Sequence, residues 1–349
     1  HAVPYGRHNM VFPRWEPAAR YFQEHWESSR SWHLYYDRTL TDYIVHNLSE
    51  WCRQTGIEGY YSDNAHPAIC DNIEAGRGYR LGDGRVQPVF NMFGVRRYFL
   101  RVRAAFAEQG AAGKIVIHTT HNLVAPWLGA HDIAYDGEHN VITPEMDRDF
   151  MDLWSLERLR AIYGPQWGVA FNFMHEYQGR WEPRRLAKAY RAYQGMVILH
   201  DALPSGNAGP PGQPLWIARD RFGIEADDVT FLPYWDRASG LACPAEGVHL
   251  AGWLRPGRLL LAVVNTGEAA EAVVRLDAAK LGLGEPGGWT VADAEAGCKV
   301  AEWVGEGKDR RREVVWDADA RPAIRHDGRG TLTVPVERHD FRQVVIAAP

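Results

Sequence analysis

The sequence predicts an α/β fold: a (β/α) barrel of the TIM type, incomplete in this chain, followed by a C-terminal β-sandwich domain. Helical and strand patterns alternate between residues 39 and 205, which is typical of a parallel sheet with helical crossovers. After a loop rich in Gly and Pro at 205–212, the hydrophobic period changes to two, as in a sandwich. The 349 residues also exceed what one hydrophobic core usually spans. We therefore expect a barrel-type catalytic domain at 1–208 and a β-sandwich domain at 209–349.

The first domain contains too few strands for a closed barrel. Apolar residues at helical spacing predict helices at 39–55, 94–108, 144–163 and 183–194. Short apolar runs predict strands at 57–62, 114–119, 133–138, 168–173 and 196–200, and a segment around 32–36 can supply one more. A complete barrel needs eight strands and about 250 residues. We therefore expect 1–208 to be the C-terminal portion of a barrel that an upstream segment or a partner chain completes.

The second domain shows alternating apolar residues in short runs that are separated by turn residues. The runs predict strands at 259–265, 272–276, 289–292, 313–316, 331–336 and 343–347. Such spacing is typical of a β-sandwich.

Composition excludes several classes of protein. The net charge of −5 and the pI near 6.3 leave no basic face for nucleic acid. No apolar run approaches the roughly 18 residues that cross a bilayer, and no signal-peptide pattern opens the sequence. We expect a soluble protein, with secretion and the periplasm as the locations left open. Among the four cysteines, Cys52 and Cys70 form a disulfide or all four remain thiols.

Polar residues that end apolar runs are the positions to examine, because barrel enzymes carry their reactive groups at the C-terminal ends of the strands. The run that begins at Ile57 delivers Asp63 and Asn64 to a loop, with His66 close behind. The alternative for Asp63 is that it caps a turn.

A second strand end presents two acids, Asp136 and Glu138. Residues two apart on an extended strand share a face, so these carboxyl groups would project together. Cleavage of a glycosidic bond needs one carboxyl group to protonate the leaving oxygen and often a second carboxylate to assist. We expect Glu138 to be the general acid, Asp136 its partner, and Asp63 a sugar ligand or second carboxylate. Gly137 between the two acids indicates the alternative, a solvated turn.

Other polar and aromatic residues near the predicted strand ends suit hydrogen bonding to sugar hydroxyls or stacking on sugar rings. The expected substrate-binding residues are Asn64, His66, Tyr61, His118, His121, Trp127, Asn172, His175 and Glu176. His and carboxylate groups also bind zinc, but these residues lack the spacing HExxH of a catalytic zinc site. We therefore expect neither a catalytic metal nor an organic cofactor.

Several short motifs resemble those of the barrel-plus-sandwich glycosidases related to glycoside hydrolase family 123. They span roughly residues 56 to 348 and comprise Gly59–Asn64, Cys70–Asn72, Gly76–Tyr79, Gly94–Arg97, Asp136–Glu138, Phe231–Trp235 and Val263–Asn265.

The resemblance implies a retaining hydrolase in which an N-acetyl group of the sugar acts as internal nucleophile, assisted by an adjacent Asp-Glu pair. The corresponding acids are Asp136 and Glu138, which Gly137 separates in this chain. The expected partner is thus a glycan, an N-acetylhexosamine-containing one in this interpretation. The rival interpretation is a carbohydrate-binding protein that uses the same cleft without catalysis.

Overall fold

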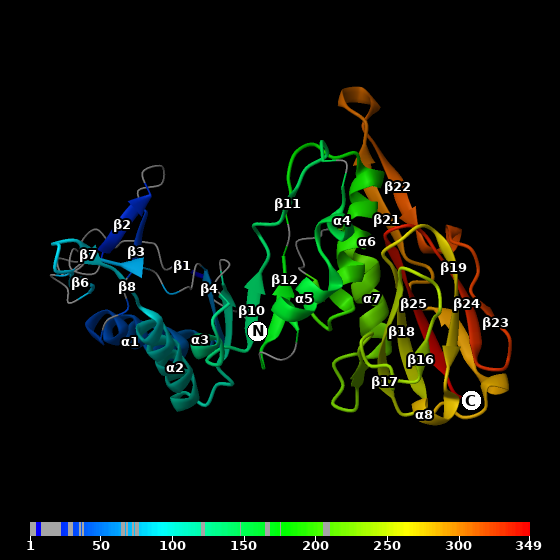
Figure 1. Cartoon of the computed structure of the whole chain (residues 1–349), viewed down its shortest axis with the longest axis horizontal. Coiled ribbons are helices and arrows are strands. Elements are labelled where there is room, and N and C mark those ends of the chain that lie inside the picture. The colour runs from blue at the N-terminus through cyan, green and yellow to red at the C-terminus, as the bar shows by residue number, and fades with distance from the viewer. Residues whose placement is uncertain are drawn as a thin grey trace. The chain divides into compact units, whose positions relative to one another are not determined.

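The structure of the chain is a computed structural model. It describes residues 5–7, 22–26, 31–34, 36, 38–63, 67, 69–71, 73, 77–119, 123–146, 148–164, 168–174, 176–204 and 210–349. The chain folds as two compact units (Figure 1). Unit 1 comprises His1–His139 and Pro165–Asn172, and unit 2 comprises Asn140–Gly164 and Phe173–Pro349.

Unit 1 is built on parallel strands in the order β1-β4-β9-β10-β12. Their bounds are β1 Tyr5–Arg7, β4 Gly59–Asp63, β9 Lys114–His118, β10 Ile133–Asp136 and β12 Ala170–Phe173. The helices are α1 Arg38–Thr55, α2 Met92–Glu108 and α3 Ala125–Leu128. Three small antiparallel pairs accompany them: β2 (Phe22–Trp26) with β3 (Ser31–Leu34), β5 (Ile69–Cys70) with β8 (Val89–Phe90), and β6 (Tyr79–Arg80) with β7 (Val86–Gln87).

The parallel sheet has one helix-covered face and one partly open face. Alternate residues Tyr60, Ile115, Ile117 and Ala134 are buried on the covered face, where the hydroxyl of Tyr60 lies 3.1 Å from that of Tyr98 in α2. The residues between them, which include Tyr61, Val116 and Tyr135, are half-buried. Strand residues alternate between faces, so the sheet presents an apolar face to the helices and a more polar face away from them.

Helix α2 begins in a tight corner that requires glycine. A Cβ atom at Gly94 would lie 2.5 Å from the carbonyl oxygen of Tyr36, too close for any other residue. The first turn of α2 can therefore approach the segment before α1 closely, which helps to fix α1 against α2.

His131 lies in the core of unit 1 and should make this unit acid-sensitive. It packs edge-on against Phe99 and Trp127, and its Nδ1 lies 3.2 Å from the carbonyl oxygen of Leu128. Burial lowers the pKa of His131 from 6.5 to about 4. As the pH falls, the unfolded chain therefore binds a proton at His131 before the folded chain does. The contribution of neutral His131 to the free energy of unfolding is complete above pH 6.5 and is lost as the pH falls towards 4.

We expect His131→Gln to remove about 3 kcal/mol of this pH-dependent loss, since one pKa unit corresponds to about 1.4 kcal/mol. Urea unfolding of the variant and the wild type at several pH values between 6.5 and 4 measures the difference. Parallel pH curves for the two proteins would contradict the prediction.

Unit 2 contains two antiparallel sheets that share a hydrophobic core, here called the two-sheet region. One sheet has the order β15-β17-β18-β25-β20, with bounds Thr230–Leu232, Val248–Arg255, Arg258–Asn265, Asp340–Ala347 and Thr290–Asp293. The other has the order β16-β19-β24-β23, with bounds Leu241–Ala242, Ala270–Leu276, Thr331–Val336 and Arg325–His326. A hairpin of β21 (Lys299–Val304) and β22 (Arg311–Asp317) lies between β20 and β23 in the sequence.

The helices of unit 2 are α4 Phe150–Leu153, α5 Leu156–Tyr163, α6 Pro183–Ile198, α7 Gln213–Phe222 and α8 Ala278–Leu281. The remaining short strands are β11 Val141–Ile142, β13 Glu176–Tyr177 and β14 Leu203–Pro204. Helix α6 (green in Figure 1) packs on β18 and β25 of the five-stranded sheet. Its start is fixed by Glu182, whose carboxylate accepts hydrogen bonds from the backbone amides of Arg184 and Arg185 at 3.0 and 2.8 Å.

The predicted strand at 196–200 is wrong, because α6 continues to Ile198 and a turn follows. The described strands of the parallel sheet do not close into a barrel, which agrees with the expectation of an incomplete one. The compact units are discontinuous in sequence, since Asn140–Gly164 belongs to unit 2 and Pro165–Asn172 to unit 1.

Cys52 is a free thiol in the structure, as are Cys243 and Cys298. Within the parts of the chain that are described, no helix is both long and apolar enough to cross a membrane.

Candidate active site

Three of the predicted residues meet at the C-terminal ends of adjacent strands in unit 1. Asp63 ends β4 and His118 ends the neighbouring strand β9. Glu138 follows β10, the next strand of the sheet. Parallel strands bring their carboxyl ends to one edge, so residues far apart in the sequence lie together there.

The three side chains form a chain of polar contacts centred on the imidazole of His118. Its Nδ1 lies 2.9 Å from Oδ1 of Asp63, and its Nε2 lies 3.3 Å from Oε2 of Glu138. Asp63 and His118 are buried, whereas the Glu138 side chain is 48% exposed. The exposed carboxyl group is therefore the one that a ligand can reach, and the buried pair holds it in place.

The order of contacts has a consequence for the position of a proton. If Nδ1–H of His118 donates to Asp63, then Nε2 is an acceptor unless the ring is charged. Its contact with Glu138 is then a hydrogen bond only when a proton lies between Nε2 and the carboxyl oxygen. The arrangement can thus keep a transferable proton next to the exposed carboxyl group of Glu138.

Asp136 does not lie beside Glu138 in the expected way. The strand ends at Asp136, and Gly137 has a φ of 110°, in the region that favours glycine. Asp136 is only 2% exposed and continues the buried, helix-covered side of β10 after Ala134. The expectation of an extended strand with both acids on one face is wrong, because the turn at Gly137 directs the chain so that Glu138 reaches His118.

Two tyrosines flank His118 on the partly open face of the sheet. Tyr135 pairs in register with His118, and the two rings meet edge-on with centroids 5.5 Å apart. Tyr61, predicted to bind substrate, lies edge-on to Tyr135 at 6.3 Å and is half-buried. Tyr135 is not among the predicted site residues, although its alternation with Asp136 in β10 places it on the opposite face.

The other predicted substrate-binding residues have different positions. Trp127 is fully buried in α3, so it offers no ring face to a sugar, and the expected stacking role is wrong in this structure. Asn172 lies on β12, and its Oδ1 is buried without a hydrogen-bond partner among the described residues. Glu176 belongs to unit 2, where it accepts a hydrogen bond from Gln178 at 2.6 Å. Asn64, His66, His121 and His175 lie outside the described residues.

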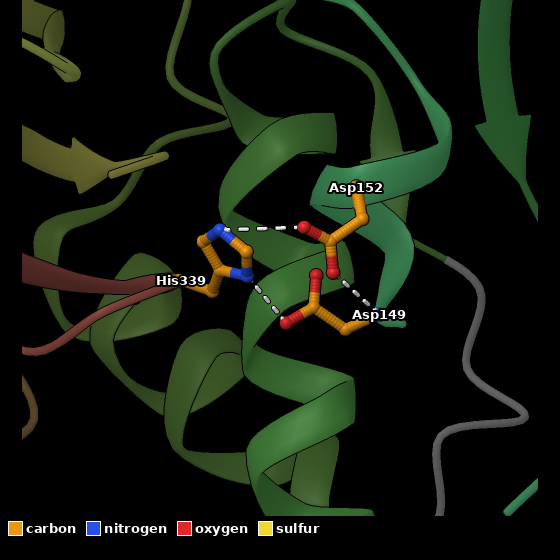
Figure 2. A group of neighbouring side chains, drawn as sticks. All are labelled: Asp149, Asp152 and His339. Atoms are coloured by element: carbon orange, nitrogen blue, oxygen red, sulfur yellow. Dashed lines mark hydrogen bonds and ion pairs between the residues drawn. The ribbon is translucent and has the colours of Figure 1, made fainter. Parts of the chain in front are cut away.

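A group with the donor set of a metal site lies elsewhere, in unit 2. Donor atoms of Asp149, Asp152 and His339 come within 4.8 Å of one another (Figure 2). Both acids already serve the first turn of α4. Oδ1 of Asp149 accepts from the amide of Met151 at 2.9 Å, and Oδ2 of Asp152 accepts from the amide of Asp149 at 2.9 Å. This capping box accounts for the two carboxylates without an ion.

Comparisons with known proteins give a likeness in fold. No protein-family model matches the sequence, and no characterised protein matches it by sequence similarity. Solved structures do match. An α-amylase from Anoxybacillus, described as a new glycosyl hydrolase subclass, aligns with a TM-score of 0.52 at 11% identity. An α-amylase from Geobacillus thermoleovorans, solved with acarbose, aligns with a TM-score of 0.52 at 9% identity. Each alignment covers 99% of this chain and 76% of the other. In fold, this chain is therefore similar to glycoside hydrolases of known structure.

Proposed function

We propose that this protein is a glycoside hydrolase and that Glu138 is its general acid. The observation that carries the proposal is the pair of contacts that His118 makes, one with Asp63 and one with Glu138. All three residues lie at the C-terminal ends of neighbouring parallel strands. Carboxyl chemistry at this position is what glycosidic cleavage requires. The likeness in fold to two α-amylases agrees with the proposal.

In the proposed reaction, Glu138 gives its proton to the glycosidic oxygen as the bond from that oxygen to the anomeric carbon breaks. His118 positions the carboxyl group of Glu138 and shares the proton of that group through Nε2. Buried Asp63 fixes the orientation of the imidazole. The Glu138 carboxylate left behind can then accept a proton from water in the second half of the reaction. The aromatic rings of Tyr61 and Tyr135 suit the apolar face of a sugar.

The substrate we propose is an N-acetylhexosamine-containing glycan, as the resemblance to family 123 implies. Of the three predicted acids, Asp63 and Asp136 are buried and Glu138 is exposed. The site departs from the adjacent Asp-Glu pair of family 123, because Asp136 is buried on the helix-covered side of the sheet. A substrate whose own acetamido oxygen attacks the anomeric carbon needs an accessible acid and no carboxylate nucleophile. This attack forms a five-membered ring between the acetamido group and the anomeric carbon. Water then opens that ring at the anomeric carbon and transfers a proton to Glu138. The exposure pattern supports this variant of the mechanism.

The first experiment tests the wild-type protein on aryl glycosides, including N-acetylhexosaminides and the hexosides that lack the acetamido group. We expect release of the aryl alcohol, and faster release from the N-acetylhexosaminides. Activity on the hexosides alone would contradict the acetamido mechanism. Binding of glycans with no turnover of any glycoside would favour the rival function, a carbohydrate-binding protein.

Asp63→Asn tests the positioning role of the buried acid. The amide keeps the shape of the side chain but no longer selects the Nδ1–H form of His118, so the proton beside Glu138 is less well held. Loss of the partner that orients a metal-bound histidine typically costs about 10-fold to 100-fold in activity, and we use the same range for His118. We expect kcat to fall by this factor and the pH–rate profile to change shape. A purely structural role would lower the amount of folded enzyme and leave the profile unchanged.

A further inference from the structure

Unit 2 contains a pocket with a cavity volume of about 310 Å³ beside helix α6. Four basic residues and two acidic residues line it, together with His339, Trp181 and Ala189. The basic residues are Arg148, Arg185, Lys188 and Arg338, and the acidic ones are Asp149 and Asp152. The lining therefore carries a net positive charge, although the whole chain is acidic.

The acidic residues of this pocket are occupied by contacts within the protein. Nδ1 of His339 lies 2.5 Å from Oδ2 of Asp149, and its Nε2 lies 3.9 Å from Oδ1 of Asp152 (Figure 2). The same two acids form the capping box of α4. Their carboxylates thus contact His339 and the helix start, and the four basic side chains of the lining outnumber them.

The basic residues are far less engaged. Arg148 and Lys188 are exposed and have no acidic partner among the residues that the structure describes. Among the described residues, the ion pairs of Arg338 are long, 3.6 Å to Asp152 and 3.7 Å to Glu268. Arg185 donates a hydrogen bond to the carbonyl oxygen of Met146 at 3.3 Å, and its guanidinium carbon lies 5.3 Å from the ring centroid of Trp181.

A metal cation is a poor occupant of this pocket. Two of its possible donor groups already accept backbone hydrogen bonds, and four positive side chains repel a cation at the same place. An anion fits better. Guanidinium groups present paired donors to a carboxylate or sulfate, and lysine adds a mobile positive charge.

The position of Trp181 indicates which class of molecule bears the anionic group. Its indole nitrogen donates to the carbonyl oxygen of Gln178 at 2.9 Å, and its ring packs edge-on against Tyr177 at 5.3 Å, so the indole is held in one orientation. A half-buried, fixed aromatic ring next to basic groups suits a sugar ring whose substituent is charged.

We propose that this pocket binds an acidic saccharide through its anionic substituent, either the carboxylate of a uronic acid or a sulfate ester. The arginines and Lys188 would bind the oxyanion and Trp181 the face of the sugar ring. The choice of a saccharide rests on the proposed function, whereas the choice of an anion rests on the lining of the pocket alone.

The experiment measures the binding of the full chain to polygalacturonate, dextran sulfate and neutral dextran by isothermal titration calorimetry at fixed ionic strength. We expect binding to polygalacturonate or dextran sulfate, and none to dextran. The polymer that binds identifies carboxylate or sulfate as the anion. The double variant R148Q/K188Q should bind at least about 10-fold more weakly, because it loses two charge-assisted contacts.

Lys308→Gln is the matched control, because this lysine is exposed in unit 2 and does not line the pocket. It should bind like the wild type, and an equal loss in this variant would overturn the proposal by showing general charge attraction. Trp181→Leu should weaken binding of the polymer and leave binding of inorganic sulfate unchanged.

Absence of binding to both polyanions would also overturn the proposal. If the wild type hydrolyses aryl glycosides and binds neither polyanion, the pocket inference alone fails. If it binds a polyanion and hydrolyses no glycoside, the proposed function alone fails.

Discussion

Glu138→Gln should lower kcat on an unactivated glycoside by about 10²-fold to 10⁴-fold, the range that general acid catalysis contributes. The amide keeps the size of the side chain and its reach to Nε2 of His118, but it has no acidic proton to deliver. An aryl glycoside with a good leaving group needs less protonation, so its hydrolysis should fall by a smaller factor. Steady-state kinetics on both substrates measures the two factors.

Glu108→Gln is the matched control for this variant. Glu108 is an exposed glutamate at the end of α2 in the same unit and is not part of the candidate site, so turnover should be unchanged. Circular dichroism of both variants checks the fold. Near-wild-type turnover of Glu138→Gln on the unactivated glycoside would contradict the assignment of Glu138 as the acid.

Arg191→Met should lower the free energy of unfolding of unit 2 by about 3–5 kcal/mol, the usual cost of breaking a buried ion pair. Arg191 lies on α6 with only 4% of its side chain exposed. It contacts Glu295 at 3.0 Å and Asp340 at 2.5 Å. Its guanidinium also lies 4.1 Å from the ring centroid of Phe341.

The variant would leave Glu295 completely buried with fewer positive partners. Burial raises the pKa of Glu295, but the charges of Arg191 and Arg321 outweigh this effect and hold the pKa below its usual value. Without Arg191 the carboxylate must bear more of the desolvation cost. Methionine fills a similar volume, so the loss reports mainly on charge.

Arg325→Met is the control for this prediction. Arg325 pairs with Glu271 at 2.9 Å, but both side chains are about 60% exposed. Such surface pairs contribute about 0–1 kcal/mol. Urea unfolding of the two variants should therefore separate them clearly, and similar values would show that the buried pair is of little consequence to unit 2.

Sequence patterns predicted helices and strands well where a segment shows one clear hydrophobic period. The predicted helix at 94–108 appears as α2 over Met92–Glu108, and the predicted strand at 331–336 appears as β24. The strand predicted at 196–200 failed because its apolar residues are the last turn of α6, which is buried on all sides. A short apolar run does not distinguish a buried helix end from a strand.

The candidate site was predictable in part for a similar reason. Asp63 and His118 end apolar runs. Because barrel enzymes carry their reactive groups at the C-terminal ends of the strands, the sequence indicated both residues. The pairing of His118 with Glu138 was not predictable, because it depends on the φ of 110° at Gly137, which reverses the alternation of faces. Nor does sequence alone distinguish a buried ring such as Trp127 from an exposed one.

The packing of α6 on a sheet made later has a consequence for synthesis on the ribosome. Asp340 follows Arg191 by 149 residues and Glu295 follows it by 104. At about 5–20 residues per second, α6 exists for roughly 7–30 s before β25 and its Asp340 are made. During that time the nascent helix exposes an apolar face and an unpaired guanidinium. Unit 2 therefore completes its core only after translation of β25, whereas the strands from β4 to β10 can assemble much earlier.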